Sequence, residues 1–253
     1  MNIISAGATD PGKIRANNED AYLVQDELGL YAVADGIGGH EGGEVASRIA
    51  IETIAAALPD LLGDKDRTPP QGLSADADRE IAALRAAVSL ANRKIRRERE
   101  LHPKLADMGT TLTALLAKRG RVFLAHIGDS RAYCLRSGEL RQLTSDHSLV
   151  AEQMQAGALT PAQARMSPYR HVITRALGIH EEIVTDTAVE PLQKGDIFLL
   201  CTDGLTEMIG DQEIAASLAK SSPRDAVREL VDKANRGGGV DNITVVVMGI
   251  AEV

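Results

Sequence analysis

The stretch LYAVADGIGGHEGG (residues 30–43) runs from an apolar segment through Asp35 into a glycine-rich turn. A short apolar run bounded by a turn is typical of a buried β-strand. The segment that follows, residues 44–58, is rich in Ala and Ile and predicts a helix. We therefore expect a buried strand that ends on an aspartate, directly before a turn and a helix.

Similar patterns continue outward in both directions. Short apolar runs predict strands at 3–8, 21–24, 30–34, 111–117, 122–128, 131–136, 139–143, 183–189, 197–202 and 243–250. Helical patterns occur at 44–58, 78–100, 149–156, 161–166, 211–219 and 223–235. The tight turns between residues 110 and 143 predict an antiparallel meander, and residues 61–77 have the composition of a loop. Strand groups that alternate with helix pairs indicate an α+β domain of antiparallel sheets covered by helices.

The chain has 253 residues, which fits one large domain or two small ones. No second core is evident beside the loop at 61–77, so we expect a single domain over 1–253. The formal charge is −8, from 28 basic and 36 acidic residues, which argues against non-specific binding to nucleic acid or an anionic membrane. Aromatic residues make up only 2%, with no Trp, so there is no evident platform for stacking bases.

The cellular location is an inference from three features of the sequence. No apolar run approaches the roughly 18 residues that a membrane span needs. The N-terminal stretch MNIISAGATDPGK does not resemble a signal peptide. Cys134 and Cys201 each lie inside an apolar run, as reduced core thiols do. We expect a cytoplasmic protein without a membrane span, and a monomer because no coiled-coil seam is present.

Acidic residues recur where predicted strands begin or end. Asp35, Asp129 and Asp203 each follow an apolar run. Glu19 and Asp20 precede the run AYLV, and Asp241 precedes ITVVV. One such aspartate could merely cap a turn. Several that converge on one sheet edge would repel one another unless cations bind between them, and without a matching His or Cys cluster the ligand type favours Mg²⁺ or Mn²⁺ over Zn²⁺.

Seven blocks in this order resemble the type 2C metal-dependent protein phosphatases, above all the bacterial branch. They are TDPGKIRANNEDA (9–21), LYAVADGIGGHEGG (30–43), MGTTLTALL (108–116), LAHIGDSRAY (124–133), LTSDHS (143–148), CTDGLTEMI (201–209) and DNITVVV (241–247). A lone Asp-Gly pair would mean little, but seven ordered blocks cover almost the whole chain. The resemblance implies a layered sandwich of two mainly antiparallel sheets flanked by helix pairs, and hydrolysis of phosphoserine and phosphothreonine in proteins.

The resemblance also implies roles for individual residues. Asp35 would bridge two Mg²⁺ or Mn²⁺ ions, and the backbone carbonyl of Gly36 would bind one of them. Asp203 and Asp241 would complete the coordination of the other ion, and Glu19 and Asp20 would act largely through metal-bound waters. Asp129 and Asp203 would hold a third ion where one is present. Arg15 would bind the substrate phosphate with its planar fork. Arg15, Asp35 and Asp203 are the expected catalytic residues.

The proton donor to the leaving group stays open. Many eukaryotic relatives carry His directly after the Asp-Gly pair, whereas this chain has Ile37 there and its nearest histidine is His40. His40 is a candidate acid, with an ordinary loop histidine as the alternative. His126, in an apolar run, is expected to be a core histidine. Residues 144–178 fall where the family carries its variable flap beside the active site, with packed surface helices as the alternative.

Two alternatives compete with the phosphatase interpretation. The carboxylates would serve a two-metal small-molecule phosphatase or phosphodiesterase equally well. A non-catalytic phosphoprotein-binding regulator is disfavoured because the matching acids and Arg15 are all present. Bacterial members typically reverse a Hanks-type Ser/Thr kinase, and some act in type VI secretion control. The expected partners are therefore phosphorylated proteins and a cognate kinase.

Overall fold

The computed structural model describes residues 1–38, 42–63 and 75–252. Most of the loop expected at 61–77 lies outside these ranges, between the end of α1 at Gly63 and the start of α2 at Ala75. The strands are β1 (Asn2–Asp10), β2 (Ala21–Gln25), β3 (Leu30–Ala34), β4 (Gly36–Ile37), β5 (Gly109–Thr110), β6 (Leu112–Lys118), β7 (Arg121–Ile127), β8 (Arg131–Arg136), β9 (Glu139–Gln142), β10 (Asp186–Pro191), β11 (Ile197–Cys201) and β12 (Ile243–Glu252). The helices are α1 (Gly42–Gly63), α2 (Ala75–Leu101), α3 (Leu149–Gln155), α4 (Pro161–Met166), α5 (Asp203–Thr206), α6 (Asp211–Lys220) and α7 (Pro223–Gly237), with a short 3₁₀ helix at Pro103–Leu105.

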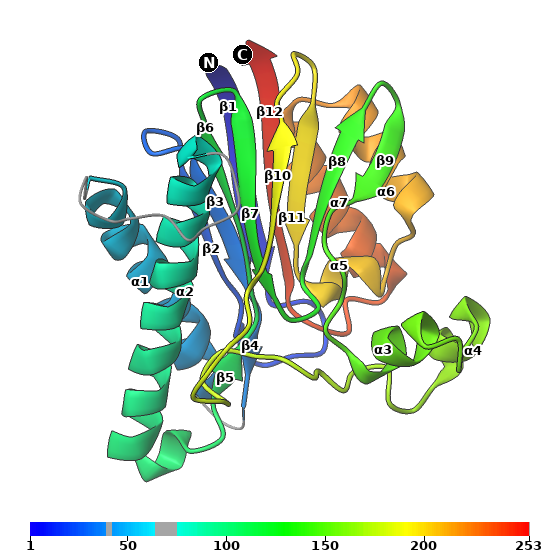
Figure 1. Cartoon of the computed structure of the whole chain (residues 1–253). Helices are drawn as coiled ribbons and strands as arrows, with labels where there is room; N and C mark the ends of the chain where they lie inside the picture. The colour runs from blue at the N-terminus through cyan, green and yellow to red at the C-terminus, as the bar shows by residue number, and fades with distance from the viewer. Residues whose placement is uncertain (39–41, 64–74, 253) are drawn as a thin grey trace.

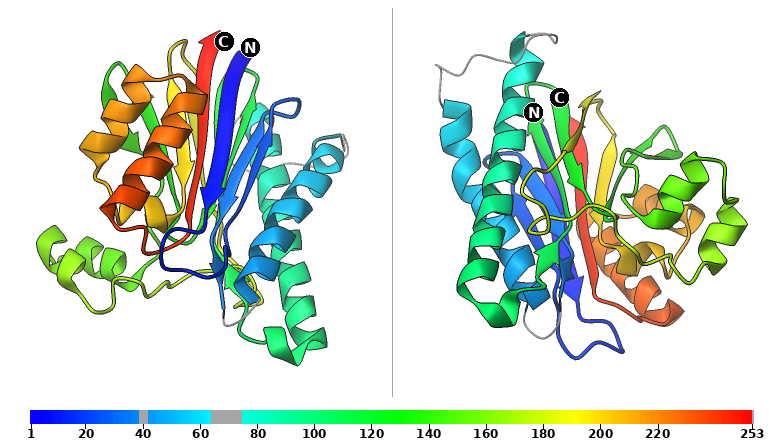
Figure 2. Two further views of the ribbon diagram at one scale, coloured as in Figure 1. Left: turned by 180° about the vertical axis from the view of Figure 1, so that it is seen from behind. Right: turned by 60° about the horizontal axis from the view of Figure 1, so that its bottom comes forward.

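Two five-stranded sheets stack face to face. One has the strand order β1-β12-β11-β8-β9 and the other β10-β7-β6-β3-β2. Every pairing within them is antiparallel. Helices α1 and α2 cover the outer face of the second sheet, and α6 and α7 cover the outer face of the first (Figures 1 and 2). The predicted layered sandwich with flanking helix pairs is confirmed.

Three apolar layers hold the sandwich together, one between the sheets and one under each helix pair. Tyr31 and Leu115 of one sheet meet Phe198 and Met248 of the other in the central layer. Because both faces of each sheet are covered, the central strands read as continuous apolar runs rather than as alternating ones. Cys134 and Cys201 are buried free thiols, as expected from their apolar surroundings.

The predicted meander between residues 110 and 143 is wrong. Strands β6 and β7 form a hairpin in one sheet, whereas β8 and β9 form a hairpin in the other. The chain therefore changes sheets at Gly128–Ser130, where Gly128 adopts a φ of 110°. Apolar runs that are buried on both faces carry no signal for which sheet they join, so local pattern could not reveal this crossover. It brings Asp129 to the seam between the sheets.

The flap expected at 144–178 projects from one end of the sandwich (Figure 1). It contains α3 and α4, close to their predicted positions, and each helix begins at a capping hydroxyl, Ser148 or Thr160. Strand β10 begins at Asp186, three residues later than predicted, while α5 and the short β4–β5 pair carried no sequence signal that we recognised. Within the described ranges, no helix has the length and apolarity that crossing a membrane requires.

Candidate active site

The acidic residues predicted from strand ends meet at one edge of the sandwich. Asp20 directly precedes β2 and Asp35 directly follows β3, its antiparallel neighbour, so they share an edge. Strand β7 runs in the same direction as β3, because two antiparallel pairings separate them, and Asp129 therefore reaches the same edge. Asp203 and Asp241 flank the antiparallel pair β11–β12 in the same way. Strand direction alone thus accounts for their convergence.

Asp20 is held at this edge by two threonines of the opposite sheet. Its Oδ2 accepts hydrogen bonds from the hydroxyls of Thr202, at 2.8 Å, and Thr244, at 2.6 Å. Both donors are buried. The carboxylate is therefore oriented before any ligand binds.

The turn after Asp35 is held equally firmly. The backbone carbonyl of Asp35 accepts hydrogen bonds from the Thr110 hydroxyl, at 2.8 Å, and from the Thr111 amide, at 2.9 Å. Gly36 donates its amide to the carbonyl of Glu19 at 3.1 Å. A Cβ at Gly36 would lie 2.5 Å from that same carbonyl oxygen and closer still to the carbonyl of Gly43. Only glycine allows these three backbone segments to approach so closely.

The buried carboxylates of the acidic edge would be stabilised by a bound positive charge. Oδ1 of Asp20, Asp129 and Asp203 is buried and has no hydrogen-bond partner among the described residues. Burial and neighbouring carboxylates raise the pKa of Asp20 to about 7, of Asp129 to about 8 and of Asp203 to about 6. They raise the pKa of Asp35 well above its ordinary value. Orphaned carboxylate oxygens at such an edge fit hard divalent cations, which would satisfy them and offset the repulsion.

The raised pKa values predict how the metal-free protein responds to pH. A carboxyl whose pKa is higher in the folded state binds more protons there, so its contribution to stability falls as pH rises through the folded pKa. We expect the free energy of unfolding in EDTA to fall by about 2 kcal/mol between about pH 5.5 and pH 8.5, which lowers the Tm by about 4–8 °C. Thermal unfolding followed by circular dichroism measures this.

Two comparisons separate the acidic edge from the rest of the protein. Saturating Mg²⁺ should remove most of this slope, the decrease in the free energy of unfolding with pH, because a bound cation stabilises the ionised carboxylates. Asp129→Asn should flatten it in EDTA, because one of the titrating groups is gone. A slope that neither change affects would show that other groups cause it.

Arg15 and Asp241 form an ion pair at the mouth of the edge. The Arg15 Nη2 lies 2.7 Å from Oδ2 of Asp241, and the two side chains are 54% and 29% exposed. Asn242 holds the loop that carries Arg15 and Glu19: its amide nitrogen donates to the carbonyls of Pro11 and Asn17, and its oxygen accepts from the Glu19 amide. Arg15 thus stands on an ordered loop with its guanidinium next to the carboxylates.

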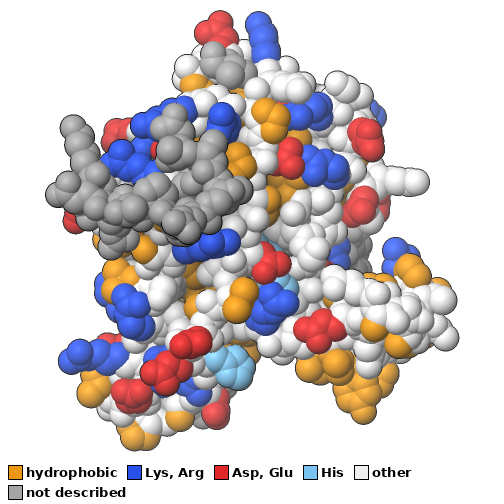
Figure 3. Space-filling view, viewed as in Figure 1, with side chains coloured by type: hydrophobic (Ala, Val, Ile, Leu, Met, Phe, Trp, Pro, Cys, Tyr) orange, Lys and Arg blue, Asp and Glu red, His pale blue; other side chains and the backbone are white. Residues whose placement is uncertain are grey.

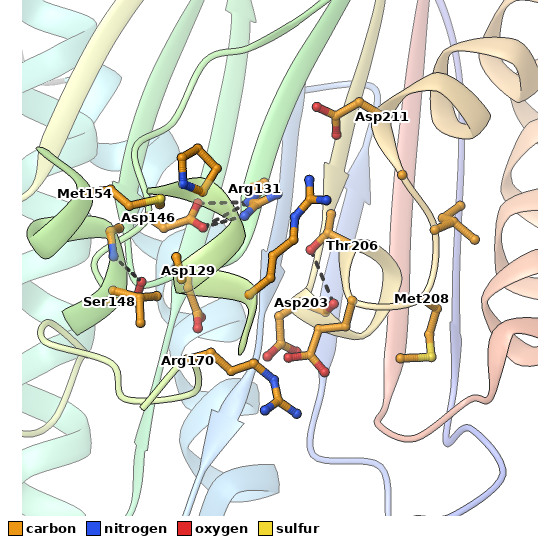
Figure 4. Close-up of a pocket in the computed structure, with 18 of the residues that line it drawn as sticks. Asp129, Arg131, Asp146, Ser148, Met154, Arg170, Asp203, Thr206, Met208 and Asp211 are labelled. Atoms are coloured by element: carbon orange, nitrogen blue, oxygen red, sulfur yellow. Dashed lines mark hydrogen bonds and ion pairs between the residues drawn. The ribbon is translucent and has the colours of Figure 1, made fainter. Parts of the chain in front are cut away.

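A groove of about 1110 Å³ runs from the acidic edge along the flap. Asp129 and Asp203 lie at one end of it, and Arg170 extends from the flap beneath them (Figure 4). On the flap side, Arg131 forms a bidentate ion pair with Asp146. The exposed large apolar side chains of the flap are Met154, Met166, Tyr169 and Val172, and apolar atoms gather along its lower border in Figure 3.

The structure brings together the predicted residues that it describes. Glu19 lies against Gly43, where a Cβ would come within 2.5 Å of the Glu19 Oε2. His126 is buried with both ring nitrogens hydrogen-bonded, to Thr113 and to the Ser145 carbonyl, as expected for a core histidine. Burial lowers its pKa to about 4. His40, the candidate acid, lies outside the described residues.

Several residues that support the site become evident only in the structure. Thr111, Thr202, Thr244 and Asn242 orient the carboxylates or their loops. Each stands next to a predicted acid or within a strand end, and their hydroxyl and amide groups at otherwise apolar positions were the available signal. Their partners lie far away in the sequence, so their contacts could not be read locally.

Comparisons with known proteins identify one family of relatives. A family model described as "Protein phosphatase 2C" matches residues 13–234. The serine/threonine protein phosphatase PstP of Mycobacterium tuberculosis is 42% identical over 247 residues, which cover 98% of this chain and 45% of that relative. The chain thus spans about half the length of that curated relative. The serine/threonine phosphatase stp of Listeria monocytogenes is 38% identical over 245 residues, which cover 95% of this chain and 93% of that protein.

Solved structures show the same architecture. The catalytic domain of PstP in complex with two manganese ions superposes with a TM-score of 0.83 at 39% identity, covering 99% of both chains. PppA, described as a key regulatory component of the type VI secretion system in Pseudomonas aeruginosa, superposes with a TM-score of 0.82 at 34% identity, covering 98% of both chains.

Proposed function

This chain belongs to the protein phosphatase 2C family, and from that membership together with its acidic edge we propose that it is a metal-dependent serine/threonine protein phosphatase. It hydrolyses phosphoserine and phosphothreonine monoesters in proteins. The observation that supports this most is the convergence of Asp20, Asp35, Asp129 and Asp203 with buried, unsatisfied oxygens or strongly raised pKa values. We further propose that residues 1–253 act as one catalytic domain, as a cytoplasmic monomer that opposes a Ser/Thr kinase.

The matching motifs of the family suggest which residues would hold the cations at this edge. Asp35 and the Gly36 carbonyl, with Asp203 and Asp241, would hold a pair of Mg²⁺ or Mn²⁺ ions, and Asp129 with Asp203 a third. Glu19 and Asp20 would accept hydrogen bonds from water at the same edge. Bound cations would activate a water molecule for attack and neutralise charge on the phosphoryl oxygens.

The protein's own residues supply orientation and a second positive group. Thr202 and Thr244 fix one oxygen of Asp20, and the other has no hydrogen-bond partner among the described residues. Arg15 is exposed and, among the described residues, forms its ion pair through Nη2, so other guanidinium N–H groups can donate to a phosphoryl oxygen. The groove beside the flap provides room for the polypeptide that carries the phosphate.

Turnover of a phosphothreonine peptide tests this proposal directly. We expect phosphate release with Mn²⁺ or Mg²⁺ and none in EDTA, together with clear preference over a phosphodiester. A folded, metal-binding protein that releases no phosphate from peptides but hydrolyses the diester would refute the proposed function. Small alkyl phosphates, assayed in parallel, separate a protein phosphatase from a small-molecule phosphatase.

Arg15→Ala should raise the KM for a phosphopeptide by about tenfold, with a smaller effect on kcat, because a charge-assisted phosphate contact is lost. Initial rates over a range of peptide concentrations measure this. Arg15→Lys should restore only part of the affinity, since Lys lacks the planar fork. Lys13→Ala removes a nearby exposed charge on the same loop and should change KM little. An equal rise in KM for Lys13→Ala would reduce the role of Arg15 to general electrostatics.

A further inference from the structure

A second group of potential metal ligands lies where the flap meets the acidic edge. One donor atom each from His171, Asp203 and Glu207 lies within 4.8 Å of the other two. Asp203 and Glu207 are four residues apart, at the first residue and the C-cap of α5, so both point from the same face of that turn. His171 comes from the flap, between α4 and β10.

The three side chains lie close enough together to share a ligand. The Nδ1 of His171 lies 2.9 Å from Oε1 of Glu207, and the two side chains are 49% and 24% exposed. Asp203 contributes a carboxylate whose Oδ1 is buried and lacks a hydrogen-bond partner among the residues described. A cation with ligand bonds of about 2.0–2.2 Å would require donor atoms to move by roughly 1 Å or less.

The ligand chemistry differs from that of the carboxylate edge. An imidazole nitrogen favours transition-metal ions such as Zn²⁺ and Co²⁺, whereas Mg²⁺ strongly prefers oxygen ligands. The two negative charges of the Asp203 and Glu207 carboxylates would also neutralise the double positive charge of the ion. The charge of Arg170, next to His171, opposes this, but its exposed side chain can turn into solvent.

The position of His171 makes such a site a link between two parts of the protein. The base of the flap is fixed by backbone hydrogen bonds, from Leu149 to the Val172 carbonyl and from Thr174 to the His147 carbonyl, both 2.8 Å. Beyond that base, α3 and α4 form one wall of the groove, and residues 206–213 form the other. His171 adjoins this base and reaches across to Glu207 on the opposite wall.

We propose that His171, Asp203 and Glu207 form a binding site for a divalent transition-metal ion, Zn²⁺ or Co²⁺ in preference to Mg²⁺, that ties the flap to the catalytic edge. This set shares Asp203 with the third-ion pair Asp129–Asp203 and differs from it by the imidazole and by Glu207. Binding at the site is independent of the proposed function, and only an effect on turnover would rest on it.

Cobalt binding by the whole chain tests the ligand set. With Mg²⁺ in large excess, titration calorimetry and the visible absorption of Co²⁺ should show a bound ion that His171→Gln and Glu207→Gln each weaken at least about tenfold. Gln at 171 keeps a hydrogen-bond donor for Glu207 but removes the imidazole, so a purely structural histidine would be replaced without loss of binding. His102→Gln is the matched control, because His102, directly after α2, pairs at 3.2 Å with Glu98 of that helix, away from the site. Unchanged Co²⁺ binding in His171→Gln would overturn the proposal.

Tryptic cleavage at Arg165 and Arg170 tests the link to the flap. We expect Zn²⁺ to slow cleavage there at least about fivefold in the unaltered chain and in His102→Gln, since cleavage follows the population of the open flap. In His171→Gln, Zn²⁺ should change the rate less than about twofold. Equal protection in His171→Gln would refute the link. Phosphatase turnover in Mg²⁺ alone is measured separately: its absence with intact Co²⁺ binding would refute only the proposed function.

Discussion

Asp35→Asn should lower kcat for a phosphothreonine peptide by about a thousandfold or more, which corresponds to roughly 4 kcal/mol of transition-state stabilisation. Asn replaces the carboxylate by a neutral amide with a single carbonyl oxygen, so it lacks both the charge and the second oxygen that the proposed bridge between two cations would need. The backbone of residue 35 stays in place, because its hydrogen bonds to Thr110 and Thr111 use only the main-chain carbonyl and amide. Steady-state phosphate release at saturating Mn²⁺ measures the loss.

The same change should stabilise the metal-free fold. Burial and the charges of Asp20, Asp203 and Asp129 raise the pKa of Asp35, so its ionised form is unfavourable at neutral pH without a cation. Asn removes that charge, and the Tm in EDTA should rise rather than fall. Asp60→Asn, at an exposed carboxylate on α1, should alter neither activity nor Tm. Retained turnover in Asp35→Asn would contradict a bridging role, and a lower Tm in EDTA would contradict the electrostatic account.

Gly36→Ala should destabilise the fold by on the order of 3 kcal/mol and lower the Tm by about 6–12 °C. The added methyl group would meet the carbonyl oxygens of Glu19 and Gly43, both of them backbone atoms of ordered segments. Backbone cannot rotate away as a flexible side chain can. Either Gly36 or its neighbours must shift, and both Asp35 and Glu19 would then be displaced.

Activity should therefore fall with stability, by at least about a hundredfold, because small displacements of positioned groups are costly. Gly63→Ala is the matched control: a Cβ there meets nothing within 4 Å, and Ala favours the helix end on which Gly63 lies. Its Tm should stay level or rise slightly. A Gly36→Ala variant as stable as Gly63→Ala would show that the close approach of the three segments is not required.

Most elements could be predicted because their signals are local. The apolar run at 30–34 and the amphipathic pattern of 78–100 need no information from elsewhere in the chain, and both elements form as expected. The prediction of the meander was wrong because strand pairing has no such local signal. Residues 122–127 and 131–135 are both almost wholly buried, so their sequences are equally compatible with either sheet. Pairing between strands is a long-range choice that the apolar pattern does not encode.

The candidate site also combines features that are local in the sequence with features that depend on distant residues. That acids stand at strand ends is a local feature, and it was enough to predict a cation-binding edge. The orientation of each acid is not local: Asp20 is held by Thr202 and Thr244, which are 182 and 224 residues away. Asn242 similarly holds a loop that ends more than two hundred residues earlier in the chain.

From its residues alone, this chain determines a layered α+β fold, an acidic edge suited to divalent cations and membership of a recognisable family. These properties depend on the order and spacing of residue types, which folding leaves unchanged. Tertiary structure decides which carboxylate oxygens are left without a partner, where the chain passes from one sheet to the other, and that His171 of the flap meets Glu207. Those depend on contacts between distant segments, because a hydrogen bond or a metal site requires atoms to lie within a few ångströms of one another in space.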